Sequence, residues 1–319
     1  MKASRISFIV TALTLVSADA APLYKVIDLS GGSSAGRFVV ADLPDAPAGG
    51  WTDEYKTTKL VLRRIEPGVF LMGSPKDEFG RRPNENQHSV TITRPFYLGV
   101  FEVTQRQWEL VKGGRPSKFN AEPWATRLVE QVSYDHVRGS SAGSRWPASA
   151  EVDANSFLGV LRAKTGLSFD LPNEAQWEYA CRAGTTSALN SGKNLEKPEM
   201  DAGMTEVGRY WYNGGCKSFR PSQDLPENTT VVGSYRPNAW GLYDMHGNVC
   251  EWCLDWYQDD LAKAVDPVGP AAETQRVNRG GSWSFWAIFC RSAHRCKNAP
   301  GGCGANSDCV GFRLCLAEK

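Results

Sequence analysis

The chain has little net charge and few long apolar segments. Its 36 Lys and Arg residues nearly balance 35 Asp and Glu residues, which leaves a formal charge of +1. Binding to nucleic acid or to an anionic membrane demands a clustered basic surface, and the sequence contains no such cluster. No window beyond the first segment approaches the ~20 apolar residues that a membrane-spanning helix needs. We therefore predict no nucleic-acid partner and no membrane insertion.

Histidine is also scarce, with four residues dispersed over the chain: His88, His136, His246 and His294. A non-haem iron site usually needs two histidines and a carboxylate on one face. None of the four is followed at the second position by Asp or Glu. The histidine pattern therefore gives no support to an iron enzyme.

The first 20 residues have the pattern of a secretory signal peptide. Lys2 and Arg5 precede an apolar run from Ile6 to Val16, and the small residues Ala18 and Ala20 follow it. This order of charge, apolar core and cleavage site is typical of exported proteins. We expect residues 1–20 to be removed and the protein to be secreted or periplasmic.

The residues after the signal peptide divide into an N-terminal extension, residues 21–56, and one domain, residues 57–319. The extension is rich in turn-forming residues around short apolar pieces. In the domain, Leu60–Ile65 and Val69–Met72 flank Pro67-Gly68 and predict a hairpin. Ser89–Ile92 predicts a further strand.

Three helices are predicted from capping residues and apolar spacing. The first opens with the capping box Thr104–Gln107 and ends at Val111. The second is expected over residues 151–164, and the third starts after Asn173 and ends before Gly184. Beyond this point the periodicity fades, so long irregular loops and buried tryptophans are expected.

Three sequence blocks in the second half of the chain carry a family resemblance. They are Leu171–Gly184, Asn238–Trp252 and Arg279–Ala293, the last of which closes at Gly311–Arg313. Together they resemble the formylglycine-generating enzyme family, or sulfatase-modifying factors, and the likeness runs from about Leu60 to Leu316. It implies a single α+β domain of the C-type-lectin-like kind, with small antiparallel sheets, few helices and much irregular loop.

The resemblance implies a calcium site in the loop from residue 244 to residue 251. Asp244 and Glu251 would supply carboxylates, while Gly247 and Val249 would supply backbone carbonyls, a ligand set that suits a hard cation. The alternative is a simple turn in which Asp244 bonds its own backbone. A second family calcium site maps less well onto three residues: Asn213, Gly214 and Asp224.

The family's oxidases bind copper(I) through two cysteines that follow Gly-Gly-Ser. In this sequence Cys290 occupies the second of these positions and Phe285 the first, and a phenyl ring cannot ligate copper. Ser282 matches a family pocket residue. Cys250 and Cys309 stand where the family has Trp and Asn, and both would line the same pocket. Either could supply a thiolate beside Cys290, or two of these three thiols could form an ordinary disulfide.

Nine cysteines in an exported chain favour disulfides, and an odd number leaves at least one unpaired within the chain. The resemblance implies tethers from Cys181 to Cys315 and from Cys216 to Cys296. Cys250 and Cys253 also have the CxxC spacing of a redox motif, but no strand-to-helix turn of a βαβ unit surrounds them.

Two functions follow from these observations. The first is a calcium-stabilised binding or accessory domain, whose groove accepts a peptide or a protein surface between Phe285, Trp286, Trp283 and Arg291. The alternative is a copper-dependent oxidase that converts a sulfatase cysteine to formylglycine, with Cys290 and Ser282 as its catalytic residues. Whether the protein is an enzyme is left open.

Overall fold

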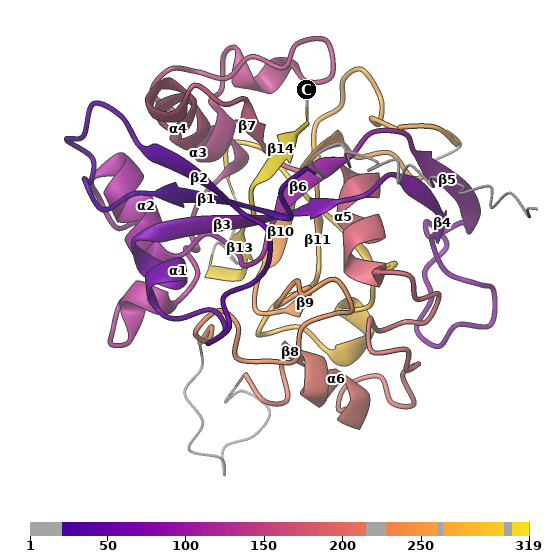
Figure 1. Cartoon of the computed structure of the whole chain (residues 1–319). Helices are drawn as coiled ribbons and strands as arrows, with labels where there is room; N and C mark the ends of the chain where they lie inside the picture. The colour runs from indigo at the N-terminus through magenta and orange to yellow at the C-terminus, as the bar shows by residue number, and fades with distance from the viewer. Residues whose placement is uncertain (1–20, 215–227, 261–263, 303–307, 319) are drawn as a thin grey trace, which may run out of the picture.

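The computed structural model describes residues 21–214, 228–260, 264–302 and 308–318. The expected signal peptide, Cys216 and Asp224 lie outside the described residues. Small sheets, short helices and long loops make up the described chain, which confirms the expected α+β architecture (Figure 1). The six described α-helices are α1 (Glu54–Thr57), α2 (Gln105–Lys112), α3 (Tyr134–Arg138), α4 (Phe157–Thr165), α5 (Glu174–Arg182) and α6 (Ala202–Val207).

The larger sheet is antiparallel throughout and has the strand order β2-β1-β3-β6-β14-β7. Its strands are β1 (Tyr24–Asp28), β2 (Val39–Leu43), β3 (Lys59–Ile65), β6 (Phe96–Gly99), β7 (Phe169–Asp170) and β14 (Cys315–Ala317). The last strand of the chain, β14, thus lies between β6 and β7, which come from much earlier in the sequence (Figure 1).

Residues 21–56 are built into this sheet. β1 pairs with β3 over five residues, with Val26 opposite Val61, and β2 pairs with β1 at the sheet edge. Tyr24 and Val26 bury their side chains against Val61. The N-terminal extension therefore shares the sheet and the core of the domain.

A second sheet has the strand order β12-β11-β10-β13 and places the segments of the family motifs side by side. Its strands are β10 (Cys250–Trp256), β11 (Arg276–Arg279), β12 (Arg295–Asn298) and β13 (Val310–Gly311). Only the pair β10 and β13 is parallel. Two small ribbons complete the strands: β4 (Gly68–Met72) with β5 (His88–Ile92), and β8 (Gly208–Arg209) with β9 (His246–Gly247).

The predicted hairpin of residues 60–72 is wrong, although both of its strands exist. Residues 59–65 pair with β1 and β6 in the large sheet, whereas residues 68–72 pair with β5. Pro67 stands between the two strands, and the chain leaves one sheet there and enters the other. Alternation of apolar residues predicts a strand but does not identify its partner.

The helix termini follow the local capping chemistry. Thr104 and Gln107 form the predicted capping box of α2, and Asn173 caps α5 through its side chain, as predicted. The second helix begins six residues later than expected, because the Ser156 hydroxyl accepts the N–H of Gly159 and caps α4 there.

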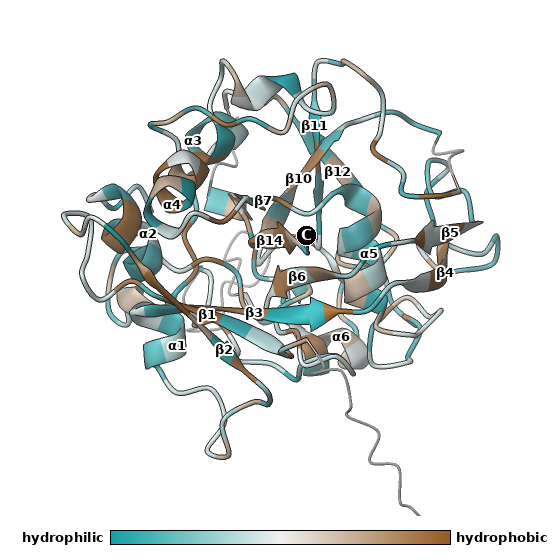
Figure 2. Cartoon of the chain, turned by 45° about the horizontal axis from the view of Figure 1, so that its top comes forward, coloured by the Kyte–Doolittle hydropathy of each residue, from teal (hydrophilic) through white to brown (hydrophobic). Residues whose placement is uncertain are grey.

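Aromatic side chains fill much of the core between the sheets and the helices. Hydrophobic and hydrophilic residues, brown and teal in Figure 2, are mixed along the helices and strands that surround it. Trp108 of α2 stacks on Phe157 of α4 with ring centroids 5.1 Å apart, and Phe312 meets both rings edge-on. Trp252 of β10 is fully buried and donates its indole N–H to the Val132 carbonyl. Tryptophan thus gives the irregular loops a packed and hydrogen-bonded interior.

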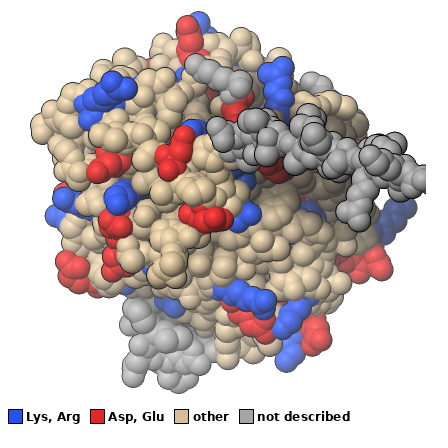
Figure 3. Space-filling view, viewed as in Figure 1, with Lys and Arg blue, Asp and Glu red and all other residues tan. Residues whose placement is uncertain are grey.

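Acidic and basic side chains are mixed on the molecular face that Figure 3 shows. Many of them form exposed ion pairs, such as Lys25 with Asp42 and Lys59 with Glu54. Among the described residues, no helix is long and apolar enough to cross a membrane.

Candidate functional site

Two consecutive glycines, Gly280 and Gly281, follow β11 and turn the chain into the candidate site. Both have positive φ, 97° and 75°, a region that L side chains rarely adopt. A Cβ at Gly281 would lie 2.5 Å from the Cys290 sulfur and 2.5 Å from the Phe289 carbonyl oxygen. The loop of residues 282–290 therefore folds back onto the turn, and only glycine leaves room for it.

This loop forms one side of an open hollow of about 580 Å³. The lining residues come from the loop and from two neighbouring segments: Arg82, Ser284, Phe285, Trp286, Phe289 and His294. Trp286 stacks on Phe289 at 6.2 Å, and the Arg82 guanidinium lies 5.1 Å from the centre of the Phe289 ring. Phe285 and Trp286 were expected here, whereas Arg82 and Phe289 were not identified from the sequence.

Trp283 and Arg291, expected as walls of the groove, do not line this hollow. Trp283 is buried and donates its indole N–H to the Asp308 carbonyl. Arg291 is fully buried and binds Glu78 at 2.5 Å and Glu85 at 2.7 Å. Its guanidinium is paired with these two carboxylates in the interior, so it is not available to a ligand.

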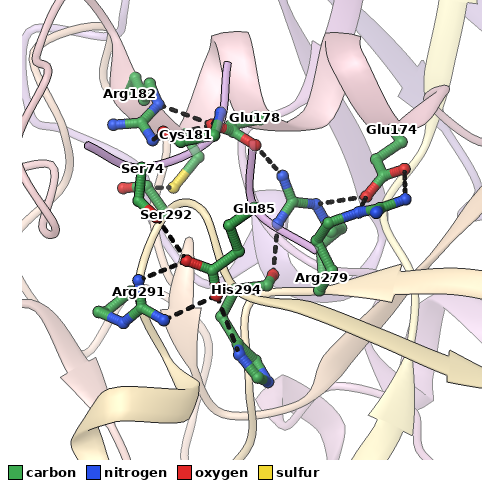
Figure 4. Close-up of polar contacts among 12 residues, drawn as sticks. Ser74, Glu85, Glu174, Glu178, Cys181, Arg182, Arg279, Arg291, Ser292 and His294 are labelled. Atoms are coloured by element: carbon green, nitrogen blue, oxygen red, sulfur yellow. Dashed lines mark hydrogen bonds and ion pairs between the residues drawn. The ribbon is translucent and has the colours of Figure 1, made fainter. Parts of the chain in front are cut away.

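Buried ion pairs extend beneath the hollow and connect the motif segments with α5 (Figure 4). Arg279 of β11 contacts Glu178 and Glu174, and Arg295 of β12 forms two hydrogen bonds with Glu174. On the other side, the Ser74 hydroxyl donates to Glu85 at 2.7 Å. Buried charges are tolerated when each one is paired and hydrogen-bonded, as here. This network holds the motif segments in a fixed arrangement.

Cys290 lies in the interior and not on the hollow. Its side chain is fully buried with Ala287 and Tyr210, and its sulfur lies 3.9 Å from the Ser282 carbonyl oxygen. Burial raises the pKa of the Cys290 thiol well above its ordinary value. Ser282 is buried as well, with its hydroxyl 3.2 Å from that of Ser284.

Two further cysteines belong to the second sheet. Cys250 of β10 is buried in the main hydrophobic core, and Cys296 of β12 is half-buried and packs against that core. The Cys296 sulfur lies 3.3 Å from Nε2 of His294, which lines the hollow. Cys309 is separate and lies 3.1 Å from the Ser284 hydroxyl.

The described cysteines are all free thiols, so the expected tether from Cys181 to Cys315 is not formed. The Cys181 sulfur lies 3.7 Å from the Ser292 hydroxyl, and the Cys315 sulfur lies 3.9 Å from the Gln176 side-chain oxygen. Cys315 stands one residue past its expected place in the strand, and such a shift turns the side chain to the other face. The pairing of Cys296 with Cys216 involves a residue outside the described ones.

Three buried carboxylates belong to the region of the expected calcium loop, although no group of three or more His, Cys, Asp or Glu side chains among the described residues is arranged to hold a metal ion. Asp244 accepts the Gly233 N–H at 2.6 Å through one oxygen, while its other oxygen, Oδ1, has no partner. Glu251 is held by Arg313 at 2.5 and 2.6 Å. The third carboxylate belongs to Glu102, which was not identified from the sequence because it lies about 140 residues earlier.

Glu102 and Asp244 each have one buried carboxylate oxygen without a hydrogen-bond partner. The Glu102 oxygen Oε1 has no hydrogen-bond partner, whereas Oε2 accepts the Asn248 amide at 2.9 Å. Burial first, and then neighbouring carboxylates, raise the pKa of Glu102 well above its ordinary value. Burial raises the pKa of Asp244 to about 6. Two unpartnered carboxylate oxygens are the donors that a hard cation such as calcium takes.

Of the second expected calcium site, the structure describes Asn213 and Gly214, which lie in a local turn. The Asn213 side chain accepts the Tyr210 N–H at 2.8 Å and donates to the Gly208 carbonyl at 3.0 Å. Gly214 approaches the Trp283 carbonyl so closely that a Cβ would lie 2.1 Å from that oxygen. Asn213 thus closes a local turn, and Asp224 lies outside the described residues.

Known relatives have a similar sequence over most of the chain. Residues 52–318 match the sulfatase-modifying factor enzyme 1-like domain. The formylglycine-generating enzyme of Streptomyces coelicolor is 30% identical over 288 residues, covering 78% of this chain and 87% of the relative. Chaperone protein LppX of Paenibacillus barcinonensis is 32% identical over 246 residues, covering 70% of this chain and 78% of the relative.

The fold has a counterpart among solved structures. Treponema denticola variable protein 1 superposes with a TM-score of 0.63 and 27% identity, covering 82% of this chain and 96% of that one. The three motif blocks, one of which forms α5 while the other two reach into the second sheet, lie inside the matched residues 52–318. The chain is therefore a member of the sulfatase-modifying factor enzyme 1-like domain family.

Proposed function

We propose that this protein is a calcium-stabilised recognition domain that binds an extended peptide or a protein surface in the hollow beside Trp286. The observation that carries the proposal is the lining of the hollow. Three aromatic rings and the Arg82 guanidinium line an open space of about 580 Å³. Aromatic and arginine side chains are the residues that dominate binding energy in protein interfaces.

The sulfur chemistry around Cys290 supports binding over copper-dependent oxidation. Copper(I) in a two-thiolate site needs both sulfurs at one point, and Phe285 stands at the first position. Cys290 is fully buried, and its sulfur lies 3.9 Å from the Ser282 carbonyl oxygen. The donor set at Cys290 therefore does not fit the copper site that the resemblance implies.

The relatives support a family-level function without fixing a reaction. One of them is named a formylglycine-generating enzyme and another a chaperone protein. A shared fold with different named activities is common, because function depends on the groups at the site. In this chain those groups are aromatic rings around an open hollow.

The proposed calcium ion would stabilise the loop that carries β9 and β10. Asp244 Oδ1 and Glu102 Oε1 would bind it directly, and the carbonyls of Gly247 and Val249 remain the expected backbone ligands. Glu251 would act mainly through Arg313, with which it forms two hydrogen bonds. Export to a calcium-rich, secreted or periplasmic environment remains part of the proposal.

The proposal is tested with one fluorescent peptide that carries the sulfatase cysteine motif. Binding is measured by anisotropy, and conversion of the cysteine is followed by mass spectrometry with copper and oxygen present. We expect binding without conversion, and Trp286→Ala should weaken it at least tenfold, about 1.4 kcal/mol. Trp124→Ala is the matched control, because Trp124 is half-buried as Trp286 is. The Arg115 guanidinium lies 4.4 Å from the centre of the Trp124 ring.

Conversion of the peptide cysteine by the wild type, but not by Cys290→Ala, would contradict the proposal and establish copper-dependent oxidation. Equal binding by Trp286→Ala and by the wild type would show that the hollow is not the binding site. A peptide that neither binds nor reacts would remove this peptide class as a ligand.

A further inference from the structure

Cys296, His294 and Glu85 lie in series at the edge of the hollow, and neither peptide recognition nor calcium binding uses this arrangement. The Cys296 sulfur lies 3.3 Å from Nε2 of His294. On the other side of the same ring, Nδ1 lies 3.7 Å from a carboxylate oxygen of Glu85. A nucleophile beside a base, with the base oriented by a third group, is the arrangement that covalent catalysis uses.

Glu85 is fixed in place and in turn orients the imidazole. Its two carboxylate oxygens accept hydrogen bonds from Arg291 at 2.7 and 2.8 Å, and one of them also accepts the Ser74 hydroxyl at 2.7 Å (Figure 4). Burial disfavours the charged imidazolium, but Cys296 and Glu85 together raise the pKa of His294 above its ordinary value. The ring is therefore suited to take up a proton from the thiol.

The order of the three side chains fits proton transfer and does not fit metal binding. The imidazole stands between the thiol and the carboxylate, with one ring nitrogen toward each. Metal ligands converge on one point, and in the described part of the chain no three His, Cys, Asp or Glu side chains do so. The histidine thus connects the other two groups as a base connects a nucleophile with its orienting partner.

A buried amide stands beside the thiol. Asn278 of β11 is directly opposite Cys296 in the antiparallel pair of β11 and β12, so the two side chains share one face of the sheet. Asn278 is fully buried, and neither polar atom of its side chain has a hydrogen-bond partner among the described residues. Unpaired buried amides are rare and call for an explanation. An amide N–H next to a nucleophile is a donor for the oxyanion that forms during acyl transfer.

The hollow gives a substrate access to these groups. The His294 ring is part of its lining and packs against the Phe289 ring, with ring centroids 5.2 Å apart. A molecule in the hollow therefore lies against the imidazole, one hydrogen-bond length from the sulfur, and Cys296 itself is only half-buried. Phe285 and Trp286 also line the hollow, and such a lining suits an apolar or aromatic group.

We propose that Cys296 is the nucleophile of an acyl-transfer site at the edge of the hollow, with His294 as general base and acid and Asn278 as oxyanion donor. Glu85 is a positioning residue that acts through the imidazole. The substrate class is a carboxylic ester whose apolar or aromatic group occupies the hollow. The site is independent of peptide recognition, because a small ester is enough to test it, and it uses neither cysteine position at which the family binds copper.

The reaction is hydrolysis of the ester in two steps. Nε2 of His294 takes the thiol proton, and the Cys296 sulfur attacks the carbonyl carbon. The C–O bond breaks, the alcohol leaves with the proton from His294, and a thioester on Cys296 remains. Water then gives a proton to His294 and attacks the thioester, the C–S bond breaks, and the sulfur recovers its proton. One ester and one water give one acid and one alcohol, and no atom changes its oxidation state.

The test uses the reduced full-length protein and 4-nitrophenyl butyrate, whose aryl alcohol absorbs visible light once it is released. We expect the wild type to release 4-nitrophenol over many turnovers, and mass spectrometry of the acid-quenched protein to find butyryl on Cys296. Cys296→Ala should lose both the turnover and the label. Cys253→Ala is the matched control, because it removes a cysteine of the same sheet that belongs to a different core cluster, and it should keep the wild-type rate.

Two further variants separate the chemistry from a structural effect. His294→Gln should lower kcat about 100-fold, because a positioned acid–base group contributes about 10²–10⁴-fold. Asn278→Leu keeps the volume and removes the donor, and it should also lower kcat about 100-fold. In both variants KM should change little, and a near-ultraviolet circular dichroism spectrum matched to that of the wild type shows that the fold is intact.

The wild-type protein alone can overturn the proposal. Absence of turnover, or butyryl on Cys309 or on lysine and none on Cys296, would refute it. A disulfide between Cys296 and Cys216 in protein purified without reductant, the tether that the resemblance implies, would identify Cys296 as a structural cysteine and would also refute it. An unchanged kcat in His294→Gln would refute the assigned base.

Discussion

Removal of calcium should destabilise this protein in a manner that depends on pH. In the calcium-free protein, burial raises the pKa of Asp244 from 3.8 to about 6. A group whose folded-state pKa is raised contributes stability in its protonated form. This contribution is complete below pH 3.8 and is lost as the pH rises through 6. The shift of roughly two pH units corresponds to about 3 kcal/mol.

Calcium should restore stability in the pH range where this contribution is lost. A ligand that binds only the folded state adds about 4 kcal/mol when its concentration is roughly 1,000 times its Kd. For a chain of this size the corresponding rise in Tm is on the order of 10 °C. At pH 5, Asp244 of the calcium-free protein is largely protonated, so calcium must compete with a proton. The calcium-induced rise in Tm should therefore be much smaller at pH 5 than at pH 7.5.

The assay is differential scanning calorimetry with calcium or EGTA at these two pH values. Asp244→Asn should lose the calcium response at pH 7.5, since an amide carries no charge. Asp255→Asn is the matched control, because burial raises the pKa of Asp255 as well, to about 7, yet its carboxylate accepts the Glu174 N–H. An equal calcium response at both pH values, or an unchanged response in Asp244→Asn, would refute the assignment of the ion.

Three further substitutions test the packing around the hollow. Arg291→Met leaves two buried carboxylates without their cation and should cost about 3–5 kcal/mol in urea unfolding, whereas Arg106→Met breaks an exposed pair and should cost under ~1 kcal/mol. Gly281→Ala should lower stability far more than Gly50→Ala. The backbone strain is matched, with φ angles of 75° and 76°, but a Cβ at Gly281 would collide with Cys290, whereas nothing lies within 4 Å of a Cβ at Gly50. An equal Tm loss for the two would contradict the close approach. Trp286→Ala should change Tm by little while it weakens peptide binding, and a large Tm loss would identify this ring as part of the core.

Local chemistry in the sequence predicts the elements that it controls directly. Thr104 and Asn173 cap their helices as expected, because a cap depends on residues three positions apart. The second helix starts late because the expectation relied on apolar spacing and overlooked Ser156 as a cap. The strand at residues 68–72 was predicted but its partner was not, since pairing depends on a segment some twenty residues away.

The candidate site was predicted only in part for the same reason. Phe285 and Trp286 lie in a motif and were identified from it, whereas Arg82 comes from a distant loop without a motif. Glu102 lies near the expected calcium loop through the fold alone. Cys296 and Cys250 belong to one sheet because β12 and β10 both pair with β11, which no spacing rule in the sequence predicts.

The motif residues that carry the family resemblance mostly serve the scaffold. Arg313 of the closing Gly-Phe-Arg binds Glu251, and Arg279 of the Arg-Gly-Gly-Ser motif binds Glu178. Trp177 donates its indole N–H to the same Glu251 at 2.7 Å. Removal of one partner from such a buried pair leaves an uncompensated charge, so the motif can persist while the reacting groups change. For this reason the motif predicts the fold well, while the reaction has to be inferred from the residues that line the hollow.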